Sequence, residues 1–219
     1  MRRDAQPCIA PRMLRVIGRG TSNKRFQQKA PPCAVDSDGK ALGAALLLKR
    51  RTLELREAMS MIELRDRLFV GIERDCREGG SEMAVIHACK HPCHVGAIGY
   101  RGSLPSSHPN YLYLESGNDL VLNMIDPPVP LFKPEMFAAF LTFSRRQFDE
   151  GRPMLIHCNL CESRAPSLAL VFLAKVSHTI SDASYVEARA EFEKVFNGYR
   201  PGQGIQTYLR EHWATLGEF

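Results

Sequence analysis

The chain has 219 residues, of which 44% are hydrophobic and 24% are charged, a composition that supports one folded domain with a full core. No apolar run reaches the roughly 20 residues that a membrane-spanning helix needs, and no secretory signal is expected. The seven cysteines are odd in number and irregularly spaced, which favours free thiols in the cytoplasm over a secreted disulfide framework.

The net charge of +5 is concentrated at the beginning of the chain. Residues 1–58 contain 13 Lys and Arg against 5 Asp and Glu, whereas residues 59–219 contain 16 against 19. We therefore predict a basic, disordered extension over 1–58 and a folded domain over 59–219. Since that domain is nearly neutral, a nucleic-acid partner is not expected. The extension has three open interpretations: a solvated tail, a basic arm for an anionic partner, or sequence upstream of the true start.

Apolar runs bounded by charged or turn-forming residues predict the first core strands. The first strand is expected over 68–72, and a second strand is expected over 83–88. Between them, residues 73–80 predict a short helix that ends at a pair of glycines. The turn-rich segment 99–109 is expected to be an exposed loop near the substrate entrance.

Five potential metal ligands crowd into the eight residues from position 87 to position 94. They are His87, Cys89, His91, Cys93 and His94. Zinc prefers such thiolate and imidazole ligands. A closed structural site, however, usually draws its ligands from two separated pairs, and the sequence offers no evident second pair. The favoured interpretation is a loop in which these side chains pack or form local hydrogen bonds, so no metal and no cofactor are expected.

The second half of the chain alternates predicted strands and helices. The expected elements, in order, are a strand over 119–125, a helix over 134–151, a strand over 154–156, a helix over 165–176, a helix over 183–196 and a last helix ending near Trp213. The aromatic stripe of the 134–151 helix is expected to be core. Ser181 or Asp182 is expected to cap the helix over 183–196.

The most informative stretch joins the strand 154–156 to the helix that follows it. His157 and Cys158 end the strand, and Arg164 stands six residues after the cysteine. A loop entering a helix N-terminus points backbone N–H groups inward and makes an anion site. A cysteine facing such a site is stabilised as the thiolate, which is the nucleophilic form. The arginine can hold two oxygens of a phosphate in its planar fork.

This His-Cys-x5-Arg pattern resembles the active-site motif of the protein tyrosine phosphatase superfamily, most of all its dual-specificity branch. The resemblance covers roughly Leu64 to Trp213. It implies an α/β fold in which helices flank a mostly parallel central sheet of about four to five strands. It also implies a cysteine-dependent phosphatase that needs no cofactor and acts on phosphorylated proteins, with phosphotyrosine favoured. In this reading Cys158 and Arg164 are catalytic, and the phosphate-binding residues are Asn159, Leu160, Cys161, Glu162, Ser163 and Arg164.

Two further residues complete the predicted site. Asp126 lies 32 residues before Cys158 and follows a predicted strand, so it is the candidate general acid for the leaving oxygen. We expect neighbouring strands to deliver both groups to one edge of the sheet. His157 is expected to support the cysteine by bonding to nearby backbone. Weaker rivals for the acid are Asp119, Asp149 and Glu162.

The motif departs from the family pattern at two positions, and these keep other functions open. Cys161 stands where the family usually has glycine, and Ala165 stands where it usually has Ser or Thr. A phosphate-binding module with little turnover is therefore one alternative. Because Cys158 and Cys161 form a C-x-x-C pair, a thiol redox protein is another. In a mixed interpretation, Cys161 protects Cys158 from irreversible oxidation by forming a disulfide with it.

Overall fold

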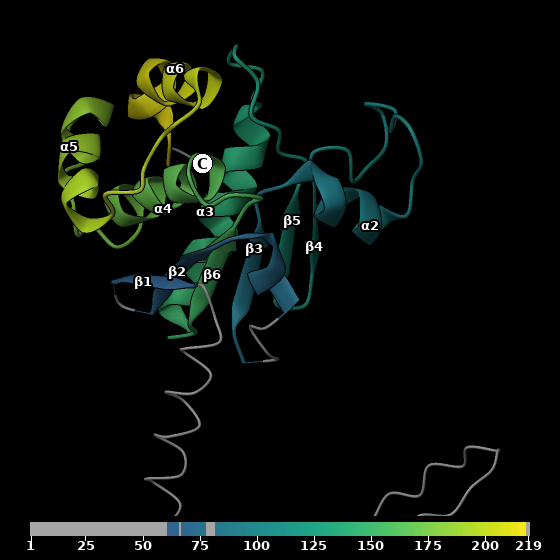
Figure 1. The fold of residues 1–219 in the computed structure, drawn as a ribbon, viewed down its shortest axis with the longest axis horizontal. Helices are drawn as coiled ribbons and strands as arrows, with labels where there is room; N and C mark the ends of the chain where they lie inside the picture. Colours follow the sequence, from purple (N-terminus) through teal and green to yellow (C-terminus); the bar gives the residue numbers. More distant parts are fainter. Residues whose placement is uncertain (1–60, 66, 78–81, 218–219) are drawn as a thin grey trace, which may run out of the picture. The chain divides into compact units, whose positions relative to one another are not determined.

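The computed structural model describes residues 61–65, 67–77 and 82–217. Its centre is a six-stranded sheet with the strand order β1-β2-β6-β3-β5-β4 (Figure 1). The strands are β1 (Ile62–Arg65), β2 (Leu68–Gly71), β3 (Ala84–His87), β4 (Tyr113–Ser116), β5 (Asp119–Leu122) and β6 (Met154–His157). The four inner strands β2, β6, β3 and β5 are parallel, and the edge strands β1 and β4 are antiparallel to their neighbours.

The predicted fold class, a mostly parallel sheet flanked by helices, is confirmed, although the sheet has more strands than the expected four to five. The additional strands are the edge strands β1 and β4. Most of their side chains are exposed, so neither segment shows the apolar run by which the inner strands are recognised.

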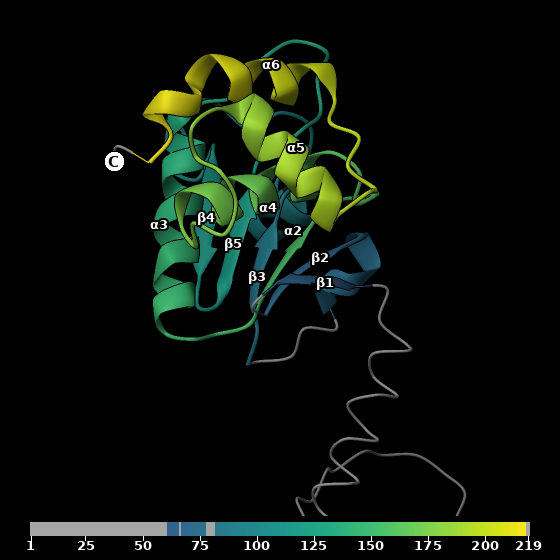
Figure 2. The ribbon, with the colours of Figure 1, turned by 90° about the vertical axis from the view of Figure 1, so that its left-hand side faces the viewer.

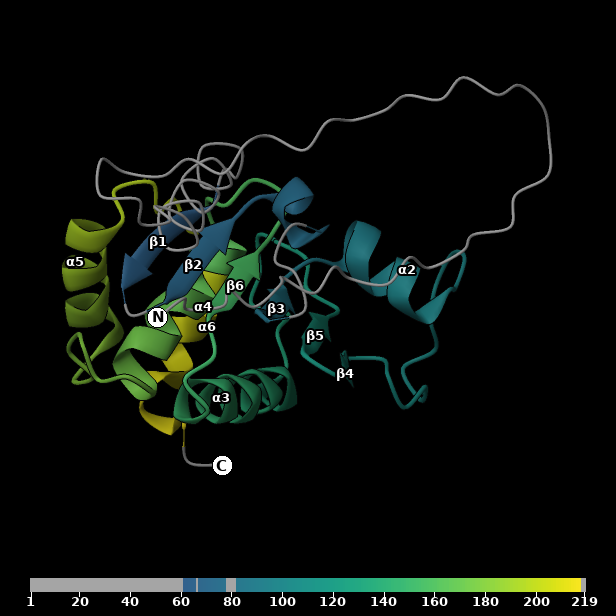
Figure 3. The same ribbon diagram turned by 90° about the horizontal axis from the view of Figure 1, so that it is seen from below.

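Four helices gather on one face of the sheet (Figures 1 and 2). They are α3 (Pro134–Asp149), α4 (Arg164–Lys175), α5 (Tyr185–Val195) and α6 (Gln203–His212), and a 3₁₀ turn, η3 (Trp213–Thr215), follows α6. Two short turns and a short helix lie elsewhere: η1 (Glu73–Arg77), η2 (Lys90–His94) and α2 (Val95–Ile98). Seen from below, α3 and α2 lie on opposite sides of β3 and β5 (Figure 3).

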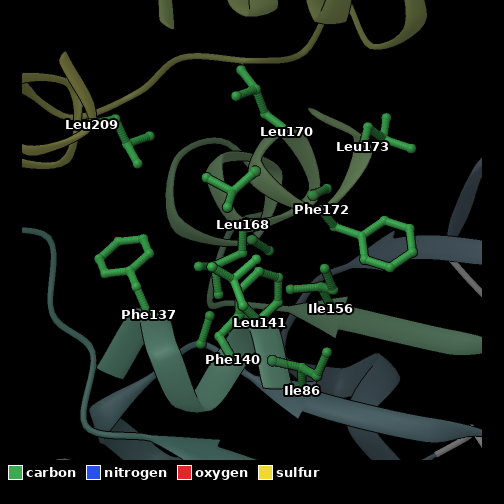
Figure 4. Packing of buried hydrophobic residues seen from close by; sticks show 14 of the residues in the cluster. Ile86, Phe137, Phe140, Leu141, Ile156, Leu168, Leu170, Phe172, Leu173 and Leu209 are labelled. Carbon is green, nitrogen blue, oxygen red and sulfur yellow. The ribbon is translucent and has the colours of Figure 1, made fainter. Parts of the chain in front are cut away.

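The core lies between the sheet and the helices. Ile86 of β3 and Ile156 of β6 point from the sheet towards Phe140 of α3 and Leu168 of α4 (Figure 4), and all four side chains are almost completely buried. Burying one such side chain stabilises the fold by roughly 1.5–3 kcal/mol. Since strand side chains alternate between faces, the neighbours His87 and His157 lie on the opposite face of the sheet.

Most predicted elements are present within one or two residues at their ends. The strand expected over 119–125 is shorter, since β5 ends at Leu122. The helix cap is also corrected: Ser184, rather than Ser181 or Asp182, accepts the hydrogen bond from the Glu187 N–H at the start of α5. The extension predicted over 1–58 lies outside the described residues. Among the helices described, none is long and apolar enough to cross a membrane.

Candidate active site

Cys158 lies where β6 ends, at the beginning of the loop that leads into α4. Its side chain is 2% exposed, and its N–H donates to the carbonyl oxygen of Gly71 at the end of β2. Four parallel strands end at this edge of the sheet. Such an edge, outside the carboxyl ends of parallel strands, is where α/β proteins usually place their binding sites.

Arg164, the first residue of α4, is held in place by hydrogen bonds from the two terminal nitrogens of its guanidinium group. Its Nη1 donates to the carbonyl oxygens of Ala88 and Met124, at 3.2 and 3.1 Å, and its Nη2 donates to Oδ1 of Asn159 at 2.7 Å. The Nε atom is buried and has no hydrogen-bond partner among the described residues. One donor on the Nε–Nη2 edge is therefore unsatisfied, which is costly unless a ligand supplies an acceptor.

The backbone N–H groups of the loop between Cys158 and Arg164 are a further set of potential donors. Within the described part of the chain, the N–H groups of residues 159–164 donate to no backbone carbonyl. The loop is fixed instead through its outer groups. Ser163 Oγ accepts from the Gly202 N–H at 2.9 Å, and the Glu162 carbonyl accepts from the Arg200 N–H at 2.8 Å. An arginine and a run of free N–H groups can together hold an oxyanion.

Asn159 connects this loop to the opposite side of the site. Its Nδ2 donates to Oε2 of Glu73 at 2.6 Å and to the carbonyl oxygen of His91 at 3.0 Å, while its Oδ1 accepts from Arg164. The amide therefore orients the arginine and ties it to η1 and η2. Glu73 could not be predicted from the sequence, because its partner Asn159 is 86 residues away and no local pattern marks the pair.

Cys161 has a left-handed backbone conformation, with φ of 56°. Glycine adopts this conformation at little cost, whereas a side chain with a Cβ is strained in it. The side chain is buried, and burial, together with the nearby Cys158, raises the pKa of the thiol to about 12. Cys161 is therefore a neutral thiol near pH 7, and it forms no disulfide. Its redox partnership with Cys158 stays a prediction.

Ala165 is completely buried at the beginning of α4. The two serines nearby are engaged elsewhere: Ser167 shares a 2.9 Å hydrogen bond with the hydroxyl of Tyr199, and Ser163 accepts from Gly202. Neither hydroxyl replaces the one that the family usually places directly after the arginine.

Asp126 is exposed on the segment that follows β5. Its carboxylate lies against the Cα of Gly202, so closely that a Cβ on Gly202 would overlap its Oδ1. Because Gly202 also donates to Ser163, one residue connects the candidate acid to the loop of Cys158. The expected strand adjacency was wrong, since β3 lies between β5 and β6. Both strands are nevertheless parallel to β3, so both deliver their residues to one edge.

His157 is fully buried, and its Nε2 shares a 2.8 Å hydrogen bond with Nδ1 of His87. Burial, reinforced by the His87 ring, lowers the pKa of His157 to about 3 against the opposing effect of the Cys158 backbone, so the imidazole is neutral. The other ring nitrogen, Nδ1, is buried and has no hydrogen-bond partner among the described residues. The expected bond to nearby backbone is therefore not made, and the imidazole bonds to a side chain on the neighbouring strand instead. The contact with His87 follows from strand register, which pairs the two residues and cannot be read from either segment alone.

The five potential metal ligands between positions 87 and 94 separate in the structure. His94 is buried and bonds to the Asn110 carbonyl at 2.9 Å and the Tyr100 hydroxyl at 3.3 Å, which is the local role expected. His87 and Cys93 instead meet two residues that are distant in sequence. The four side chains that come together are Cys76, His87, Cys93 and His157.

The three rivals for the general acid are placed as follows. Asp119 begins β5, and its Oδ1 lies 3.5 Å from Nε2 of His87. Asp149 ends α3. Glu162 is exposed within the loop itself.

No family model and no curated protein sequence matches this chain. Solved structures do. A single-substitution variant of human DUSP28 is 14% identical, with a TM-score of 0.50 over 72% of this chain and 97% of that one. DUSP15 is 16% identical, with a TM-score of 0.50 over 72% of this chain and 90% of that one. These likenesses establish the fold: the chain has the α/β fold of the dual-specificity phosphatases.

Proposed function

We propose that this protein is a phosphoric monoester hydrolase of the tyrosine and dual-specificity type, which acts through a phosphocysteine intermediate. Cys158 is the nucleophile, Arg164 and the N–H groups of residues 159–164 bind the phosphate, and Asp126 is the general acid. His157 supports the nucleophile from the adjacent position.

The state of Arg164 is the observation that carries this proposal. Its Nη1 is fixed by two backbone carbonyls, while its buried Nε has no partner among the described residues. An arginine held in this way presents its Nε–Nη2 edge for a planar, two-oxygen contact. The edge lies in a loop whose own N–H groups make no backbone hydrogen bonds within the described part of the chain. This combination suits the equatorial oxygens of a phosphoryl group.

The chemistry follows in two steps. In the first, the Cys158 thiolate attacks phosphorus, the bond from phosphorus to the leaving oxygen breaks, and Asp126 gives that oxygen a proton. In the second, Asp126 takes a proton from a water molecule that attacks the phosphocysteine, which releases inorganic phosphate and restores the thiolate. Arg164 and the loop amides stabilise the charge on the oxygens in both steps.

The surroundings of the site favour a phosphate carried on an apolar or aromatic group. Leu160 on the loop is 71% exposed, and Ile125 and Val129, on either side of the Asp126 segment, are 47% and 48% exposed. The loop residues 159–163 contain no lysine and include Glu162, so heavily charged polyphosphates are disfavoured. We therefore propose phosphorylated proteins as substrates, with phosphotyrosine preferred.

The test is hydrolysis of a small aryl phosphate by the wild type, Cys158→Ser and Asp126→Ala, with Asp149→Ala as the matched control. Asp149 is also an aspartate at an element end, but it lies at the end of α3. We expect a loss of about 10⁴-fold or more with Cys158→Ser, a loss of about 10²–10⁴-fold with Asp126→Ala, and wild-type rates with the control. Full activity in Cys158→Ser would refute the mechanism, and full activity in Asp126→Ala would refute only the acid assignment.

A phosphate-binding module with little turnover is the second candidate. It is favoured by the left-handed Cys161 and by Ala165, which lacks the hydroxyl that assists release of the thiolate. The two candidates differ in a direct measurement. A binding module holds a phosphotyrosine peptide without releasing phosphate. The proposed enzyme releases phosphate from the same peptide over many turnovers, well beyond one equivalent per protein.

A further inference from the structure

Four potential metal ligands meet on the face of the sheet opposite the core. One ligand atom from each of Cys76, His87, Cys93 and His157 lies within 4.8 Å of all the others. The four residues come from four elements: η1, β3, η2 and β6. None of them belongs to the loop of residues 158–164, so this cluster is distinct from the candidate phosphate site.

Strand register brings the two histidines together. His87 and His157 are paired across the parallel strands β3 and β6, and both point away from the face that carries Ile86 and Ile156. Their rings meet edge to face, with centroids 4.7 Å apart and an angle of 85°. The nitrogens Nδ1 of His87 and Nε2 of His157 are 2.8 Å apart.

The two cysteines reach this pair from the short turns that follow β2 and β3. Cys93, in η2, places its Sγ 3.9 Å from Nε2 of His157. Cys76, in η1, supplies the fourth atom within the 4.8 Å limit. In the sequence the second ligand pair is split between positions 76 and 157, which is why the segment 87–94 alone did not reveal a complete set.

We propose that Cys76, His87, Cys93 and His157 bind one Zn²⁺ ion in a closed tetrahedral site. Two thiolates and two imidazoles form one of the usual donor sets of structural zinc, with Zn–S of about 2.3 Å and Zn–N of about 2.0–2.1 Å. Those bond lengths place the ligand atoms of a tetrahedron roughly 3.3–3.8 Å apart. Two of the separations are 2.8 Å and 3.9 Å, and all of them are within 4.8 Å, so shifts of about 1 Å or less in each ligand atom bring the four side chains to the tetrahedral spacing.

The neighbours of His87 support this assignment. Its Nε2 lies 3.5 Å from Oδ1 of Asp119, which leaves Nδ1 directed towards the cluster. A carboxylate behind the far nitrogen of a ligating histidine is a common feature of zinc sites, because it fixes the tautomer and the ring orientation. Asp119, a rival for the general acid in the sequence, therefore gains a role of its own.

An ion can reach the cluster from solvent. A surface hollow of about 510 Å³ is lined by Cys76, His87, Cys93 and Asp119, whereas His157 is completely buried. The three partly exposed ligands thus form the open side of the site and His157 forms its floor. This arrangement provides the entry path that a metal site requires.

The ion would fix the surroundings of the phosphate loop without touching substrate. His157 directly precedes Cys158, and Asn159 bonds to Glu73 of η1 and to the His91 carbonyl of η2. The metal and the Asn159 amide would thus join the same two turns to the end of β6. Since four protein ligands fill a tetrahedral zinc, the role is structural, with no open position for catalysis.

The experiment uses the full chain, purified without chelator and without a histidine tag. We expect about one Zn²⁺ per chain by elemental analysis. Added to the metal-free protein, Co²⁺ should give the intense visible bands of a tetrahedral ion and a thiolate-to-metal charge-transfer band. Cys76→Ser, Cys93→Ser and His87→Ala should each lose stoichiometric metal and the cobalt spectrum.

Two matched controls separate the cluster from its neighbourhood. Cys89→Ala removes a buried cysteine next to Cys93 that is outside the set, and His178→Asn removes an exposed histidine; both should retain the metal. The cobalt spectrum of the wild type decides the proposal even if a ligand variant fails to fold. An octahedral spectrum without charge transfer, only trace zinc after reconstitution, or metal loss in either control would overturn it.

Discussion

Two regions of opposite chemistry lie back to back at the ends of the same parallel strands. The first, which we call the anion region, is the loop from Cys158 to Arg164, whose N–H groups and guanidinium edge suit an anion. The second, which we call the cation region, is the cluster around His157, whose thiols and imidazoles suit a metal cation. One peptide bond separates the two regions. The two regions differ in how the sequence encodes them: the first lies within seven consecutive residues, and the second is built from residues up to 81 positions apart.

Local encoding explains which features could be predicted. The loop of Cys158 is recognisable because strand, cysteine, arginine and helix follow one another in the sequence. The inner strands and the helices have equally local signals. The cluster depends on the register that pairs His87 with His157 and on a turn that returns Cys76 to them. Such long-range pairing leaves no mark in any short segment of the chain.

Substitution of the nucleophile should have the largest effect on activity. This effect should be limited to the loop of Cys158 and should leave the metal cluster unchanged. We expect Cys158→Ser to lower aryl phosphate hydrolysis by about 10⁴-fold or more, the scale seen when an enzyme loses its nucleophile. Bound zinc and the cobalt spectrum should be unchanged, because Cys158 is not among the four proposed ligands. Steady-state kinetics and elemental analysis on the same preparation measure both. Parallel loss of metal would show that the two regions are not separate.

Arg164→Lys tests whether the anion region needs the planar edge or only the charge. Lysine keeps the charge but cannot make the two-oxygen contact or the three hydrogen bonds of Arg164. We expect kcat/KM to fall by about 10²–10³-fold. Arg189→Lys is the control, since Arg189 lies on α5 and pairs with Glu193 at the surface. Equal activity of the Arg164→Lys enzyme and the wild type would mean that the fork has no part in phosphate binding.

Gly202→Ala tests whether the close contact with Gly202 positions Asp126 for its role as the acid. The new Cβ would overlap the Asp126 carboxylate, so the acid must move, and we expect kcat to fall by about 10²-fold, part of the contribution of a general acid. Gly96→Ala is the control, because a Cβ there meets no atom within 4 Å. In an Asp126→Ala background, Gly202→Ala should cost little further, since coupled residues are not additive. Additive losses would place the effect of Gly202 elsewhere.

Metal removal should affect stability through the cation region. When the free metal concentration is about 100 times the Kd of the site, binding stabilises the fold by about 2.7 kcal/mol. Removal of the metal by a strong chelator should therefore lower the Tm by roughly 5–10 °C. Circular dichroism of the wild type and Cys93→Ser, each with and without chelator, measures this. The variant should show the lower Tm under both conditions. A chelator effect of equal size in Cys93→Ser would locate the stabilising metal at other residues.

The smallest expected effect is a difference in stability between glycine and alanine variants. Its sign should depend on the backbone conformation of the buried cysteine that is replaced. Cys161 has φ of 56° and Cys89 has φ of −150°. Glycine and alanine both remove the thiol, but only glycine relieves a left-handed strain, so Cys161→Gly should be more stable than Cys161→Ala by about 1 kcal/mol, or about 2–4 °C in Tm. At Cys89 the order should reverse by about 0.5–1 kcal/mol, because glycine there only adds freedom to the unfolded chain. Denaturant unfolding of the four variants measures both differences. The same order at both positions would mean that the phosphate loop accommodates a Cβ at Cys161 without strain.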